Sequence, residues 1–178
     1  MRPRSMSWRK VSVMTALAMV AGGIVWAHWP RKPLPADTRA DRVVVRKAAR
    51  TLELYRGAEL LRTYSIALGR DPVGHKAQEG DNKTPEGQYV LDSRNPASSF
   101  HKSLHVSYPS PADTAAARAR NVSPGGAIMV HGIRNGMGFL GRLHRMNDWT
   151  AGCIAVTNQD IEEIWRVVPD GTPILIEP

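Results

Sequence analysis

The chain has 178 residues, one cysteine and a formal net charge of +8. A single cysteine excludes a disulfide framework within the chain, and the stretch after residue 40 is the size of one domain. Residues 1–30 hold four of the 24 basic side chains and none of the 16 acidic ones, and no nucleic-acid motif follows, so we expect no nucleic-acid partner.

The N-terminal segment combines a basic start with a long uncharged run. The basic residues are Arg2, Arg4, Arg9 and Lys10, and Val11–Trp29 carries no charge. This length is near the ~20 residues of a membrane-spanning helix, whereas Val25-Trp26-Ala27 resembles a signal peptidase site. We therefore expect residues 1–29 to be a membrane anchor or a signal peptide, which puts the rest of the chain outside the cytoplasm.

Residues 30–40 are expected to form a linker, and the strands begin after them. Pro30, Pro33 and Pro35 favour an extended, semi-rigid spacer. Short β-branched segments between turn residues then predict strands over 43–45, 51–55, 60–68, 88–91, 103–108 and 127–130. Arg56-Gly57 is typical of a hairpin turn, so the first three strands should form an antiparallel meander.

Helical signal is sparse. Residues 114–120 are alanine-rich and predict a short surface helix. A clearer helix follows Thr157, which forms a capping-box-like pair with Asp160 before apolar residues at helical spacing; these are Ile161, Ile164, Trp165 and Val168. Pro169-Asp170-Gly171 ends it, and residues 172–176 predict a last strand. Residues 41–178 are thus expected to form one mostly β domain with one main helix directly after the cysteine.

Cys153 is the leading candidate nucleophile. A thiol becomes reactive when a base or positive partial charges stabilise its thiolate. His131 follows an apolar strand and is the first candidate base, while the small residues Thr150, Ala151 and Gly152 would let backbone N–H groups form an oxyanion hole. The alternative is that Cys153 is a small buried hydrophobe and His131 a structural residue.

A metal site is the third interpretation of the same residues. His131, His144, Cys153 and Asp148 include good zinc ligands, but their spacing matches no compact zinc motif. We therefore expect no metal and no other cofactor.

Two separated motifs carry a family resemblance. The segment Ile128–Gly132 followed by Thr150–Ile154 resembles the His-Gly and Ser/Thr-His-Gly-Cys signatures of the L,D-transpeptidase (YkuD-type) catalytic domain. Upstream, Gly80–Tyr89 is similar to the family's Gly-Asp-x-x-Thr-Pro-Glu-Gly segment. The resemblance covers residues 41–177 and implies a β-sandwich fold.

The resemblance also implies a function in cell-wall biogenesis and cell shape. Family members are cysteine acyltransferases of peptidoglycan stem peptides, on the periplasmic side of the envelope. By position, Cys153 would be the nucleophile, His131 the base, and Gly152 with the Cys153 amide part of the oxyanion hole. We expect a monomer whose partners are stem peptides and, through its N-terminal segment, the membrane.

The sequence departs from the family pattern close to the cysteine. Ala151 stands where a histidine is common and Ala155 where an arginine is common, and the segment between the two motifs is long. His144 or Arg145 in that segment would supply the missing polar group, or else would lie in a solvated loop bonded to Asp148. These departures leave a carboxypeptidase or amidase open beside the transpeptidase, and also a non-catalytic wall-binding module.

Overall fold

The computed structural model describes residues 8–178, so the expectations placed on Arg2 and Arg4 lie outside it. Helix α1 spans Trp8–His28, and the contacts divide the chain between Lys32 and Pro33. Within residues 8–178, no helix combines the length and the apolarity needed to cross a membrane. The membrane anchor or signal peptide expected at residues 1–29 stays a prediction.

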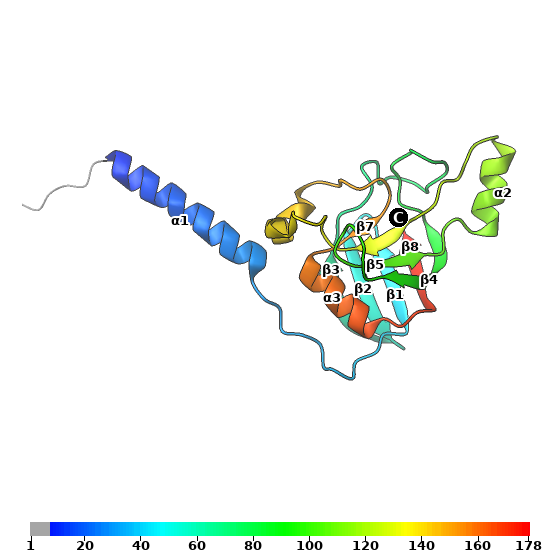
Figure 1. Ribbon diagram of the computed structural model, residues 1–178, viewed down its shortest axis with the longest axis horizontal. Coiled ribbons are helices and arrows are strands. Elements are labelled where there is room, and N and C mark those ends of the chain that lie inside the picture. Colours follow the sequence, from blue (N-terminus) through cyan, green and yellow to red (C-terminus); the bar gives the residue numbers. More distant parts are fainter. Residues whose placement is uncertain (1–7) are drawn as a thin grey trace, which may run out of the picture. The chain divides into compact units, whose positions relative to one another are not determined.

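The domain is built on one eight-stranded sheet, shown in Figure 1. Its order is β3-β2-β1-β8-β4-β5-β6-β7. The strands are β1 (Arg42–Arg46), β2 (Thr51–Arg56), β3 (Glu59–Ser65), β4 (Gly87–Asn95), β5 (Ser103–Val106), β6 (Met129–His131), β7 (Ile154–Ala155) and β8 (Thr172–Glu177). The predicted meander β1-β2-β3 is confirmed by its antiparallel pairing.

The sheet curls until its two edges meet. Ala67, just beyond β3, pairs with Ala155 of β7 through two backbone hydrogen bonds of 2.9 and 2.8 Å. One residue further, the Thr150 amide donates to the Leu68 carbonyl at 3.1 Å. The expected mostly β domain is therefore confirmed, and its strands form one curled sheet in which these bonds satisfy the backbone groups of both edges.

Three helical segments accompany the sheet. Helix α2 (Pro111–Ala119) starts earlier than predicted because Ser110 and Asp113 form a complete capping box. Helix α3 (Asn158–Val167) has Thr157 as its N-cap, as predicted, and buries Ile161 and Ile164 in the core of the sheet. The segment η1 (Gly138–Met146) is a pair of short 3₁₀ turns that the sequence pattern did not indicate.

Part of the proline-rich segment is packed rather than extended into solvent. The Leu34 amide donates to Glu163 at 2.7 Å, and the Arg166 guanidinium donates to the Leu34 and Pro35 carbonyls at 3.0 and 2.9 Å. Leu34 also packs against the core. Residues 33–40 thus form part of the domain, attached to α3, which the linker expectation missed.

Candidate active site

The nucleophile candidate and the base candidate come from two paired strands. β6 and β7 run parallel, with Val130 opposite Ile154 and His131 opposite Ala155. Because alternate residues of a strand face the same side, Met129 and His131 share a face, and Cys153, directly before β7, lies beside it. The register of this short pair therefore brings the thiol and the imidazole into one cavity, which both residues line.

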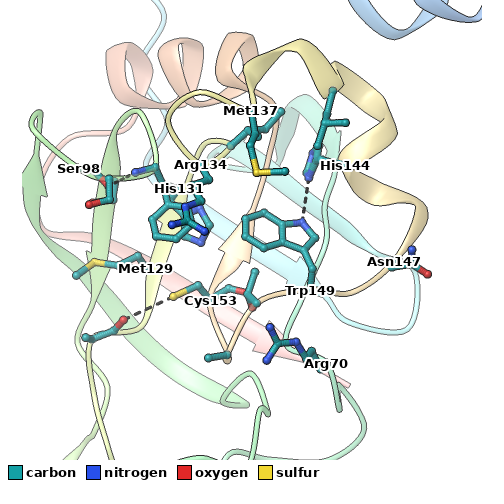
Figure 2. Close-up of a pocket in the computed structure, with 18 of the residues that line it drawn as sticks. Arg70, Ser98, Met129, His131, Arg134, Met137, His144, Asn147, Trp149 and Cys153 are labelled. Carbon is teal, nitrogen blue, oxygen red and sulfur yellow. Dashed lines mark hydrogen bonds between the residues drawn. The ribbon is translucent and has the colours of Figure 1, made fainter.

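The cavity has a volume of about 830 Å³. Figure 2 shows His131 and Trp149 over the Cys153 side chain on its wall. Of the predicted site residues, the cavity is lined by Cys153, His131, His144, Thr150 and Ala151.

His131 is held with one defined nitrogen free. It is buried, and its Nδ1 lies 2.6 Å from the Gly132 carbonyl oxygen. A carbonyl only accepts, so Nδ1 carries the proton and Nε2 keeps the lone pair of the neutral ring. Burial lowers the pKa of His131, against a smaller raising effect of the Gly132 carbonyl. The ring is thus neutral at neutral pH and ready to accept a proton at Nε2.

Cys153 is a half-buried free thiol. Its Sγ lies 3.6 Å from the Ala127 carbonyl oxygen, a contact drawn as a dashed line in Figure 2. Burial raises the pKa of the thiol, while the Met129 amide and the Lys76 charge lower it by less. The resting site therefore holds a neutral thiol near a neutral imidazole, and attack needs a proton transfer.

Thr150 and Gly152 shape the loop that carries the nucleophile. The Thr150 hydroxyl donates to the Cys153 carbonyl at 2.7 Å and accepts from the Gly152 amide at 3.1 Å. The Gly152 amide is thus already bonded, which corrects the expectation that it belongs to an oxyanion hole. The Cys153 amide makes no hydrogen bond to residues 8–178 and remains available as an oxyanion donor.

Gly152 is required by a close backbone approach. Its φ is +134°, and a Cβ there would lie 2.6 Å from the Lys83 carbonyl oxygen. Gly69 is similarly confined, with the Asn82 carbonyl oxygen 2.0 Å from its Cβ position. The Gly-Asp-x-x-Thr-Pro-Glu-Gly segment therefore lies directly against the cysteine loop, a role that motif reading did not assign to it.

His144 is buried in the cavity wall, and its ring is oriented by Trp149. The Trp149 Nε1–H donates to His144 Nδ1 at 3.4 Å, a weak contact that leaves the proton of the neutral ring on Nε2. That Nε2 is buried without a partner among the described residues. Burial, followed by the charges of Arg145 and His131, lowers the pKa of His144 to about 4.

Arg145 lies elsewhere, beside a second cavity with Asp148. Asp148 makes bonds to other parts of the domain. Its carboxylate accepts from the Arg50 guanidinium at 2.7 and 2.9 Å and from the Leu68 amide at 2.8 Å. Asp148 therefore ties the cysteine loop to the turn before β2, through Arg50, and to the segment that follows β3, through Leu68.

The residues of the cavity wall that sequence reasoning missed include one aromatic and two basic side chains. Phe100 stacks on His131 with 4.5 Å between ring centroids, and Arg70 and Arg134 bring two guanidinium groups. None of these three residues belongs to a motif that the sequence analysis identified.

Within residues 8–178, no group of three or more His, Cys, Asp or Glu side chains is arranged to hold a metal ion. Asp148, one of the four ligands considered, is bonded to Arg50.

Comparisons with known proteins agree with this geometry. The family model described as the L,D-transpeptidase catalytic domain matches residues 40–176. YafK of Escherichia coli (strain K12), provisionally named an L,D-transpeptidase, is 30% identical over an alignment of 176 positions that covers 90% of this chain and 64% of that protein. The chain thus spans just under two thirds of that relative's length.

Solved structures share the fold. Pgp2, the helical cell shape determining protein of Campylobacter jejuni, aligns with a TM-score of 0.58 and 24% identity over 88% of this chain and 54% of that one. An L,D-transpeptidase from Mycobacterium smegmatis aligns with a TM-score of 0.51 and 16% identity, covering 78% and 59%. At these identities the likeness concerns the fold alone.

Proposed function

The chain belongs to the L,D-transpeptidase catalytic domain family, and from this membership we propose that it is a cysteine acyltransferase that modifies peptidoglycan stem peptides. The observation that carries the proposal is the His131 ring, anchored at Nδ1 and free at Nε2, in the same cavity as the Cys153 thiol. A structural histidine would need no free nitrogen there.

The reaction begins from two neutral groups. As Cys153 Sγ attacks the amide carbon between an L-centre and a D-amino acid, its proton passes to His131 Nε2. The oxyanion that forms accepts from the Cys153 amide. Collapse breaks the C–N bond, the imidazolium returns its proton to the leaving amine, and a thioester remains on Cys153. An amine or water then attacks the thioester and regenerates the thiol.

The charge of the cavity favours an anionic peptide. Among residues 8–178, those that line it include Arg70 and Arg134 and no Asp or Glu. Peptides that carry free carboxylates beside the scissile bond fit such a wall, because guanidinium groups bind carboxylates in bidentate geometry.

The acceptor decides between transpeptidation and hydrolysis. Ala155 is fully buried and bonded to Ala67 in the sheet closure, so β7 brings no cation to the cavity at the position where the family commonly has arginine. Without that cation, water is the competing acceptor, and carboxypeptidase or amidase activity is the second candidate.

The site of action is part of the same proposal. The basic start and the uncharged run Val11–Trp29 support export to the periplasmic side of the envelope. A cell-shape role and a monomeric state stay predictions.

The test uses the full chain with purified muropeptides, followed by mass spectrometry. We expect loss of a D-amino acid with either a new cross-link, exchange with an added D-amino acid, or hydrolysis, and none of these with Cys153→Ser. Masses unchanged by the unsubstituted protein, together with a thiol that resists iodoacetamide at neutral pH, would show a wall-binding module instead.

A further inference from the structure

A buried ion pair lies in the loop that supports the cysteine. Lys76 is 3% exposed, and its Nζ donates to Asp81 Oδ1 at 2.8 Å and to the Gln78 carbonyl at 3.1 Å. Neither residue is needed by the reaction described above. Burying an ammonium group is costly even when it is paired, so its retention calls for an explanation.

Asp81 organises this loop through backbone hydrogen bonds. Its carboxylate accepts from the amides of Ala77, Gln78 and Lys83 at 2.7, 3.0 and 3.0 Å. Burial alone would raise its pKa, but the hydrogen bonds from Lys76 and these amides outweigh it and lower the pKa of Asp81 to about 2. The Asp81 carboxyl is therefore ionised at neutral pH.

The loop reaches the nucleophile by direct contact. Lys83, whose amide Asp81 binds, presents its carbonyl oxygen 2.6 Å from the Cβ position of Gly152, the residue before Cys153. A continuous series of contacts thus runs from Lys76 through Asp81 and Lys83 to the cysteine loop. Lys76 also acts on the thiol through space: its charge opposes the effect of burial on the pKa of Cys153.

We propose that Lys76, held by Asp81, is a positioning residue that stabilises the Cys153 thiolate and fixes the loop beneath it. The proposal rests on the proposed function, because it concerns the same nucleophile. The other ionisable groups around the thiol are His131, His144, Arg70 and Arg134, all in the cavity wall, whereas Lys76 is buried outside that wall.

Lys47 provides a matched control. It is also buried and paired, with Nζ 2.7 Å from Glu86 Oε1, and it also donates to loop carbonyls, those of Gly74 and Thr84. The pKa of Cys153 is shifted by burial, the Met129 amide and the Lys76 charge, and Lys47 is not among these causes. Lys47→Met should therefore cost stability without changing the thiol.

The experiment measures the rate of iodoacetamide alkylation of the full chain against pH. In Lys76→Met the apparent pKa of Cys153 should rise, and alkylation at neutral pH should slow by about threefold to tenfold, since one pKa unit is a factor of ten. Lys76→Arg should restore the profile, and Lys47→Met should keep it. An unchanged profile in Lys76→Met, or an equal shift in Lys47→Met, would overturn the proposal.

Asp81→Asn keeps the test decisive if Lys76→Met does not fold. Removing the carboxylate leaves the ammonium unopposed, so the apparent pKa of Cys153 should fall. If the apparent pKa of Cys153 rises in Asp81→Asn, the loop affects the thiol only through its conformation and not through the charge of Lys76. That result would overturn the proposal. Failure of the proposed function looks different: a normal alkylation profile with no change in any muropeptide.

Discussion

At the scale of residues, the site rests with both reacting groups neutral. Burial lowers the pKa of His131 and raises the pKa of Cys153, so a preformed thiolate–imidazolium pair is disfavoured. The proton must move during attack, and the orientation of His131 by the Gly132 carbonyl becomes decisive.

His131→Gln tests this requirement. Glutamine cannot take the thiol proton, so acylation of Cys153 by a labelled carbapenem should fall by at least about a hundredfold. Circular dichroism should show the same thermal unfolding as the unsubstituted chain within a few degrees. Unchanged acylation kinetics would transfer the role of base to His144.

His144 predicts a pH dependence of stability. Its pKa is about 4 in the folded chain and 6.5 when unfolded, so the unfolded state binds more protons between these values. The contribution of His144 to the free energy of unfolding is therefore complete above pH 6.5. As the pH falls toward 4, this contribution decreases by roughly 3 kcal/mol. Urea unfolding of the unsubstituted chain should show this fall, and His144→Asn should reduce it. Equal slopes for the two proteins in this window would contradict the prediction.

At the scale of elements, three backbone segments meet beneath the nucleophile. The turn at Gly69, the segment Asn82-Lys83 and the loop at Gly152 approach too closely for any side chain. Their contact explains why a motif far upstream in the sequence accompanies the cysteine motif. It also makes the cysteine loop sensitive to substitutions that leave the thiol untouched.

Gly152→Ala should therefore destabilise the fold by about 3 kcal/mol or more, through backbone strain and a clash with the Lys83 carbonyl. Gly171→Ala is the control, since Gly171 also has a positive φ, +85°, but nothing lies within 4 Å of its Cβ position. That change should cost only about 1–2 kcal/mol. Chemical unfolding measures both, and equal losses would show that strain alone matters.

At the scale of the whole molecule, the domain begins earlier than its first strand. Residues 33–40 contact α3 through Leu34 and the Arg166 and Glu163 side chains. They connect the chain entering the domain to the helix that follows the cysteine strand. Shortening the chain from its N-terminal side should therefore lower the stability of the domain once residues of this segment are removed.

A chain of residues 33–178 should unfold cooperatively with the stability of the domain, whereas residues 41–178 should lose these contacts. The expected difference is about 1–2 kcal/mol, or roughly 5 °C in Tm. Differential scanning calorimetry of the two chains makes the comparison. Identical Tm values would mean that the segment contributes no stability.

The sequence by itself determined the local features. Strand segments, the Thr157 cap of α3 and the pairing of one cysteine with a histidine after an apolar strand are encoded in residues close together in the chain. Side-chain periodicity and capping act over a few residues, and the family motifs are short as well. The roles of Cys153 and His131 remain predictions, now joined by a shared cavity.

Only the tertiary structure decided what depends on distant segments. The bonds between Ala67 and Ala155 join the two edges of one curled sheet, and Thr150 uses the Gly152 amide that was assigned to the oxyanion hole. The neighbours of Lys76 and Arg70 could not be read from the sequence, because they arise when the loop before β4 folds against the cysteine loop. Such contacts depend on which distant backbone segments approach each other and on which buried polar groups still need a hydrogen-bond partner. A local sequence pattern contains no information on either.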